Sequence, residues 1–67
     1  YKLQRELEAL PGQIDAVEAE LAGVQETIAQ QDFYLRPQDE QRETLARLDA
    51  LQQELDALLE RWAELED

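Results

Sequence analysis

Apolar residues recur at alternating intervals of four and three through the first half of the chain, and this spacing constrains the fold more than any other feature. The series runs through Leu3, Leu7, Leu10, Ile14, Val17, Leu21, Val24 and Ile28. A sustained 4-3 repeat predicts an α-helix that buries one narrow apolar stripe against a partner helix, as in a coiled coil. No stretch alternates with a period of two, so strands are not expected.

The second half of the chain carries a matching stripe, formed by Leu48, Leu51, Leu55, Leu58, Trp62 and Leu65. Leu45 and Leu59 widen this stripe on one side, which suits a helical bundle as well as a two-helix seam. Two amphipathic helices of similar length predict an all-α fold. We therefore expect an antiparallel two-helix coiled-coil hairpin, formed as a single domain over residues 1–67.

Composition excludes several classes of protein. The 67 residues include 17 acids and 6 bases, for a net charge of -11, and contain neither Cys nor His. Disulfides are therefore impossible, and a zinc site is nearly excluded because Cys and His supply most zinc ligands. So acidic a chain repels phosphate backbones. No apolar run approaches the roughly 20 residues that span a bilayer, so no membrane contact is expected.

Pro11, followed by Gly12, interrupts the first stripe without shifting its phase. Proline has no N–H to donate to the carbonyl oxygen of Leu7. A kink within one helix and a short break between two helices are equally compatible with the sequence. Residues 1–10 are thus expected to form a short helix or a helix extension, and residues 11–31 the first arm.

The heptad pattern fails over residues 32–37, which we interpret as the tip of the hairpin. Proline disfavours helix in the residue before it, so Pro37 should end this irregular segment. Its fixed φ also suits the start of a helix, and Asp39 and Glu40 place negative charge at the positive end of the helix dipole. The second arm is therefore predicted over residues 38–66.

Heptad spacing allows two registers between the arms. In the first, the numbers of facing residues sum to 65, which sets Leu21 against Thr44. That register also brings opposite charges together across the arms, Glu6 with Arg61 and Glu20 with Arg47. In the second, the numbers sum to 72, the six layers from Leu7 with Leu65 to Val24 with Leu48 are all apolar, and the tip is centred near Arg36.

Burial of apolar side chains decides the predicted register. Burying a Leu or Val contributes roughly 1.5–3 kcal/mol, more than an exposed ion pair. The first register sets Val24 against the polar Gln41, so we expect the second. In that register Trp62 fills the core against Leu10 and Pro11.

Side chains for catalysis are scarce. Without His, Cys or Ser the chain has no nucleophile–base pair of the common kinds. Paired carboxylates such as Glu18 and Glu20 are typical of a solvated coiled-coil surface. A two-helix hairpin offers no cleft, and no Gly-rich phosphate loop is present. We therefore predict no catalytic, cofactor-binding or metal-binding residues and expect that the domain is not an enzyme.

Basic residues gather at the two ends of the predicted hairpin. Arg36 and Arg42 lie toward the tip beside Phe33 and Tyr34, and aromatic rings beside Arg can stack on unpaired bases. Alternatively, both rings fold back to seal the core, which the exposed last layer of a two-helix core favours. The candidate nucleic-acid contacts are Lys2, Arg5, Phe33, Tyr34, Arg36, Arg42 and Arg61. The candidate structural residues are Leu10, Pro11, Tyr34, Pro37 and Trp62.

Three segments resemble the C-terminal domain of Uup-like proteins, bacterial ATPases of the ABC-F class. They are the opening YKLQRELEALP, Asp32-Phe33-Tyr34 at the turn, and the closing ERWAELE. The resemblance implies a parent chain with two ABC domains that bind ATP and Mg²⁺ and act in the cytoplasm on ribosomes or nucleic acids. It also implies a hairpin linked to DNA binding. Tyr34 matches the family's turn tyrosine, and Arg61 and Trp62 match the closing motif, with structural roles.

Taken with this resemblance, the sequence predicts a non-catalytic C-terminal accessory module that contributes to nucleic-acid binding, to DNA or to the ribosome, by an ABC-F ATP-binding protein. The alternative is a purely structural or protein-binding coiled coil. Two arms of similar length favour pairing within one chain, so we expect a monomer. Its other expected partners are the ABC domains of the same chain.

Overall fold

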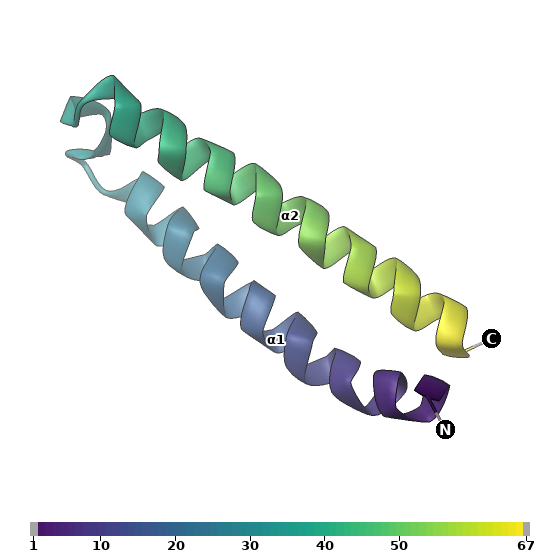
Figure 1. The fold of residues 1–67 in the computed structure, drawn as a ribbon. Coiled ribbons are helices and arrows are strands. Elements are labelled where there is room, and N and C mark those ends of the chain that lie inside the picture. Colours follow the sequence, from purple (N-terminus) through teal and green to yellow (C-terminus); the bar gives the residue numbers. More distant parts are fainter. Residues whose placement is uncertain (1, 67) are drawn as a thin grey trace.

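The computed structural model describes residues 2–66 and shows two long antiparallel helices side by side (Figure 1). Helix α1 spans Lys2–Ala29, a short 3₁₀ helix η1 spans Phe33–Leu35, and α2 spans Gln38–Glu66. The rod measures 50 × 16 × 14 Å, and both of its chain ends lie at the end opposite the tip. The predicted all-α hairpin is confirmed.

The two apolar stripes form the seam between the arms. Leu10, Ile14, Val17 and Leu51 are buried, each 6% exposed or less. Nearly all the other stripe residues are half-buried; Leu3, at 61% exposed, is the exception. No polar or charged side chain is buried among the described residues. The core is therefore a single apolar seam, as the 4-3 spacing predicts.

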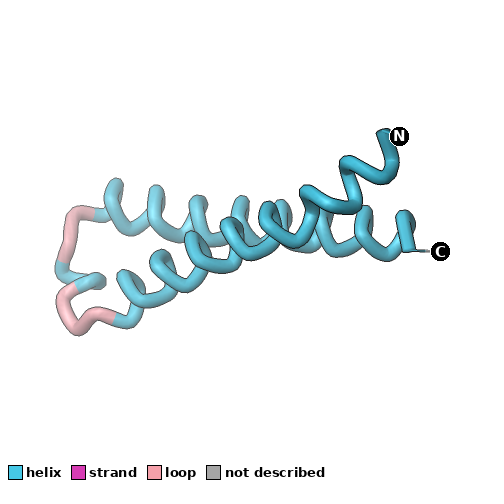
Figure 2. Tube along the Cα trace, turned by 90° about the horizontal axis from the view of Figure 1, so that it is seen from below, coloured by secondary structure: helices cyan, strands magenta, loops and turns pink. Residues whose placement is uncertain are grey.

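Helix α1 continues through Pro11 without a break. The missing N–H at Pro11 removes one helical hydrogen bond, and such positions bend helices rather than end them when the neighbouring turns are well packed. In Figure 2 the N-terminal turns of α1 lie away from the end of α2. The divergence accounts for the exposure of Leu3, and of the two sequence-based alternatives the short break is wrong.

Helix α2 starts immediately after Pro37. The Pro37 carbonyl oxygen accepts hydrogen bonds from the backbone N–H groups of Glu40 and Gln41 at 3.1 and 3.2 Å. Asp39 and Glu40 occupy the first turn of the helix, where its dipole favours negative charge. Helix α1 ends at Ala29, two residues before the predicted end of the first arm, so the irregular tip spans residues 30–37.

The predicted register is wrong. Arg61 pairs with Glu6 at 2.7 Å and Arg47 with Glu20 at 3.0 Å, so the residue numbers sum to 67 in both cross-arm pairs. These are the contacts of the first register considered from the sequence, not of the one with a sum of 72. Trp62 accordingly lies about level with residue 5 rather than with Leu10, and it is half-buried. The interpretation of Trp62 as a core residue against Leu10 therefore fails.

Hydrogen bonds explain why polar side chains are tolerated in the seam of this register. Gln41 occupies a seam position, yet its Nε2 donates to the carbonyl oxygens of Tyr34 and Arg36 at 3.1 and 2.7 Å. The Thr44 hydroxyl donates to the Glu40 carbonyl oxygen at 2.9 Å. These polar groups are satisfied within the hairpin, so placing them in the seam costs little. Counting apolar layers alone overstated their penalty.

Phe33 closes the core at the tip. Its side chain is 0% exposed, although it lies in a short loop between two exposed segments. Backbone hydrogen bonds from the N–H of Phe33 to Gln30 and from the N–H of Arg36 to Phe33 turn the chain around it. Sealing by Phe33 requires the tip to be centred near residue 33, which is incompatible with a tip centred near Arg36.

Phe33→Ala should destabilise the hairpin by about 3–5 kcal/mol, the usual cost of removing a buried Phe ring. Leu35→Ala is the matched control, because Leu35 lies two residues away and is 85% exposed; it should change stability by about 0.5 kcal/mol or less. Urea and thermal unfolding followed by circular dichroism measure both. Phe33→Leu, which keeps an apolar side chain, should fall between them. Equal effects of the two alanine variants would contradict closure by Phe33.

The Glu6–Arg61 pair predicts a specific pH dependence. Its hydrogen bond to Arg61 lowers the pKa of Glu6 below the ordinary value of 4.5. The resulting stabilisation is present above the unfolded-state pKa and is lost as the pH falls through the folded-state pKa. Glu6→Gln should therefore lower the melting temperature at neutral pH, and the difference from wild type should shrink below about pH 4.5.

Glu18→Gln is the control for this measurement, because it makes the same charge change on the exposed surface of α1. Melting temperatures of both variants and wild type are compared across the pH range. A Glu6→Gln effect that equals that of Glu18→Gln at neutral pH would contradict the stabilising role of the pair.

Candidate nucleic-acid interface

The tip presents two neighbouring side chains to solvent, one aromatic and one aliphatic. Tyr34 is 65% exposed and Leu35 is 85% exposed. The Tyr34 ring stands perpendicular to that of the buried Phe33, with 4.9 Å between ring centroids and 84° between ring planes. Of the two predicted aromatic contacts, Phe33 is therefore part of the core and unavailable to a ligand, whereas Tyr34 is accessible. The sealing interpretation holds for Phe33 alone.

Side-chain hydrogen bonds fix the shape of this tip. Gln41 reaches back from α2 and holds the carbonyl oxygens of Tyr34 and Arg36. Arg36 has extended backbone angles, as the following proline requires. Its Nη2 donates to Oε1 of Gln30 at 2.8 Å, which ties the two sides of the loop together.

Two arginines supply positive charge at the tip. The Arg36 side chain bonds a neutral amide, and neither Arg36 nor Arg42 forms an ion pair within residues 2–66. Arg42 is exposed one turn into α2, beside Gln41 and Gln38. Both guanidinium groups therefore keep their full charge toward an external anion, although acidic residues also flank the tip.

The open end differs from the tip, because Arg61 there already forms ion pairs with carboxylates of the same chain. Arg61 donates from Nε and Nη2 to the two carboxylate oxygens of Glu6, at 2.7 and 2.9 Å, and from Nη1 to Glu64 at 3.1 Å. The hydrogen bonds to Glu6 and Glu64 raise the pKa of Arg61 above its ordinary value. Arg61, a predicted nucleic-acid contact, is thus a structural residue that joins the arms. Lys2 and Arg5 are exposed at this end.

The shaft between the two ends is acidic. Asp15, Glu18, Glu20, Glu54 and Asp56 are all exposed along it. Arg47, the one basic residue along this shaft, forms an ion pair with Glu20, which compensates its positive charge. A phosphate chain lying lengthwise on the rod would therefore meet net repulsion.

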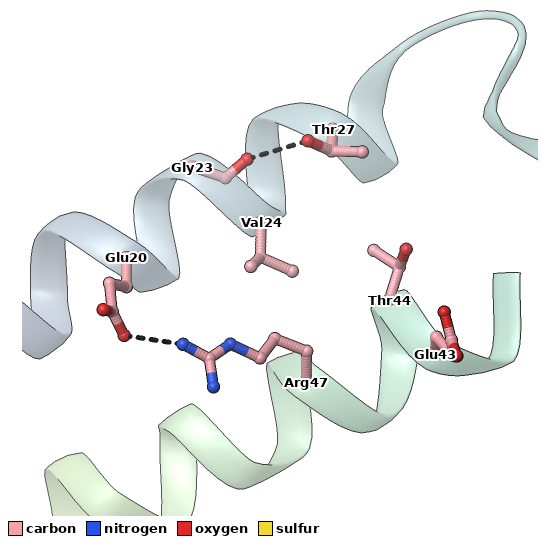
Figure 3. A pocket seen from close by; sticks show the side chains of 7 residues that line it. All are labelled: Glu20, Gly23, Val24, Thr27, Glu43, Thr44 and Arg47. Atoms are coloured by element: carbon pink, nitrogen blue, oxygen red, sulfur yellow. Dashed lines mark hydrogen bonds and ion pairs between the residues drawn. The ribbon is translucent and has the colours of Figure 1, made fainter. Parts of the chain in front are cut away.

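An open groove of about 530 Å³ lies between the arms next to the tip (Figure 3). Its lining residues are Glu20, Gly23, Val24, Thr27, Glu43, Thr44 and Arg47. The Thr27 hydroxyl donates to the Gly23 carbonyl oxygen at 3.1 Å, and Arg47 crosses the groove to Glu20. No buried side-chain nitrogen or oxygen lacks a partner in the described chain. The groove is the consequence of the polar layer in the seam, where Val24 has no apolar residue opposite it.

Residues 2–66 contain no cluster of three or more acidic, His or Cys side chains arranged to hold a metal ion. Neither of the long helices in the described part of the chain is apolar enough to cross a membrane.

The structure thus separates the residues predicted from the sequence. It places Tyr34, Arg36 and Arg42 at one accessible tip, buries Phe33, pairs Arg61 with Glu6 and Glu64, and leaves Lys2 and Arg5 at the far end. Leu35, Gln30 and Gln41 belong to the tip but were not predicted. The sequence did contain one signal for Gln41: it is a polar residue at a seam position soon after a turn, which indicates a side chain that bonds the loop.

Comparisons with known proteins agree with this architecture. The whole chain, residues 1–67, matches the ABC transporter C-terminal domain family. It is 42% identical over 66 residues to the ATP-binding protein Uup of Escherichia coli (strain K12), a match that covers 98% of this chain and 10% of that protein. The chain therefore spans about a tenth of the length of this relative.

A solved structure of the C-terminal domain of the Uup protein, described as a DNA-binding coiled coil motif, has the same fold. The TM-score is 0.87 at 42% sequence identity, over 98% of this chain and 78% of that one. These matches confirm the resemblance seen in the three sequence segments, and the chain belongs to the ABC transporter C-terminal domain family.

Proposed function

We propose that this hairpin is a non-catalytic accessory module that contributes nucleic-acid binding to an ABC-F ATP-binding protein, and that it does so through its tip. One observation carries the proposal. Arg36 lies on the same short loop as the exposed Tyr34, Arg42 lies one turn into α2, and neither arginine forms an ion pair within residues 2–66. The tip therefore combines an exposed aromatic ring with two arginines that form no ion pair within residues 2–66.

Similarity to the Uup domain supports the choice of ligand, since that domain is described as DNA-binding at 42% identity to this chain. By the same resemblance, ATP and Mg²⁺ would be bound by ABC domains elsewhere in the parent chain, which would act in the cytoplasm. The hairpin would serve those domains as a projecting contact, either to DNA or to ribosomal RNA.

The charge distribution sets the strength of this binding. A net charge of -11 and an acidic shaft oppose any extended phosphate contact. Two arginines imply a slope of log affinity against log salt of about -2 on duplex DNA, at roughly -0.9 for each phosphate contact. Binding by the hairpin alone should therefore be weak, with a modest dependence on salt.

A purely structural or protein-binding coiled coil is the second candidate. Leu45 and Leu59 favour it, because they lie 43% and 46% exposed on α2 beside the seam. Pairing of the arms within one chain already buries the main stripe, so we propose that the hairpin itself is monomeric.

Charge reversal at each end tests the proposed function. The variant Arg36→Glu/Arg42→Glu should weaken binding of labelled DNA at low salt by at least about tenfold and reduce the salt slope by about two. Lys2→Glu/Arg5→Glu changes the net charge by the same amount at the opposite end and should have a smaller effect. Fluorescence anisotropy across a salt series measures both. Equal losses from the two variants, or no binding by the wild type at low salt, would refute the tip as the interface.

A further inference from the structure

We infer that the tip binds unpaired nucleotides, with one base stacked on Tyr34 and the adjoining phosphates held by Arg36 and Arg42. This inference rests on the proposed function and narrows it from nucleic acid in general to strands whose bases are free. Base stacking on an aromatic side chain needs an open ring, a fixed ring position and positive charge nearby. The tip supplies each of these.

The Tyr34 ring is open and yet supported. It is 65% exposed, so most of its surface faces solvent. Its perpendicular contact with Phe33, at 4.9 Å between centroids, rests it against a side chain that is itself completely buried. The exposed ring is thus anchored to the core of the hairpin, and little side-chain freedom remains to be lost on binding.

The backbone beneath the ring is also fixed. Gln41 binds the carbonyl oxygen of Tyr34 itself and that of Arg36. The N–H groups of Leu35 and Arg36 donate to Asp32 and Phe33, which completes the short 3₁₀ turn. The backbones of Tyr34 and Arg36, two residues apart, are therefore held on one constrained loop.

Arg36 can hold a phosphate without giving up its present position. One of its five N–H donors is used by Gln30, a neutral partner, and the bond steadies the guanidinium without cancelling its charge. Arg42, one turn into α2, adds a second cation with no ion pair within residues 2–66.

Duplex nucleic acid fits this surface less well. Its internal bases are stacked on both faces and cannot also stack on Tyr34, so a duplex contacted along its length would engage the arginines alone. A duplex extending from the tip along the rod would meet the exposed carboxylates of the shaft, including Glu20 and Glu54. An unpaired strand gains the stacking contact and needs to touch the tip only.

Three labelled probes of equal length separate the contributions of base and backbone. They are a thymidine single strand, the same strand built from abasic nucleotides, and a blunt duplex. The 67-residue chain should bind the thymidine strand about tenfold or more tightly than the abasic strand. A uridine RNA strand is titrated in parallel, because it offers the same phosphates and a pyrimidine base that differs from thymine only by a methyl group; the tighter of the two strands indicates the natural source.

Variants at the tip assign the stacking contact. Tyr34→Ala should lose about tenfold in affinity for the thymidine strand and nothing for the abasic strand or the duplex. Tyr34→Phe and Tyr34→Trp should retain binding, because each keeps an aromatic ring. Leu35→Ala is the matched control, since Leu35 is the more exposed neighbour and has no π-system; it should bind all probes as wild type does. Circular dichroism checks that each variant is folded.

The two proposals fail in different ways. If the thymidine and abasic strands bind equally and Tyr34→Ala changes neither, while Arg36→Glu/Arg42→Glu weakens both, stacking is refuted and the tip interface stands. If Leu35→Ala weakens binding as much as Tyr34→Ala, a general apolar contact replaces stacking and the inference is refuted. If no probe binds at low salt, the proposed function fails, and this inference falls with it.

Discussion

Closure of the tip around Phe33 is the constraint on which the rest of the structure depends. A two-helix seam has no third layer to cover its last turn, so the loop must supply an apolar residue, and Phe33 does so with its side chain fully buried. That position fixes where the chain reverses. The reversal sets the register, and the register in turn decides which charges meet across the arms, Glu6 with Arg61 and Glu20 with Arg47. One buried ring in an eight-residue tip, residues 30–37, thus determines contacts near the opposite end of the rod.

The helices could be predicted from the sequence because a 4-3 spacing has one physical interpretation. Every stripe residue except Leu3 is buried or half-buried in the seam. The register could not be predicted in the same way, because shifting one arm by a heptad preserves the seam. The choice depends on the tip, where Gln41 donates to the backbone carbonyl oxygens of Tyr34 and Arg36, which are in place only once the loop has folded. The Thr44 hydroxyl donates to Glu40 one turn earlier in its own helix, so it is satisfied in either register. The wrong register was predicted because a polar residue in the seam was counted as lost apolar burial. The heptad pattern does not show the hydrogen-bond partner that offsets this loss.

The sequence predicted the kind of candidate site and its location at the tip, but not which residues belong to it. Aromatic and basic residues near a turn indicated the tip, yet the sequence alone could not distinguish Phe33 from its neighbour Tyr34. One of two adjacent aromatic residues must face inward when the loop closes, and the 3₁₀ turn leaves the other outside. Arg61 was likewise indistinguishable from Arg36 until the register was known. The register brings Glu6 to Arg61, which also bonds Glu64 on its own helix, whereas Arg36 bonds the neutral amide of Gln30 within the tip.

The two ends of the rod consequently have different roles. At the open end, pairing of Arg61 with Glu6 holds the arms together where the N-terminal turns of α1 diverge from α2. At the tip the arms are already joined by the chain, so no ion pair is required there, and a neutral amide from Gln30 suffices to steady Arg36. The covalent turn therefore releases the tip arginines for an external partner. Because both chain ends lie at the open end, a domain preceding this chain would connect there, and the rod would present its tip up to about 50 Å away. The same geometry that makes the hairpin stable also makes its far end available for binding.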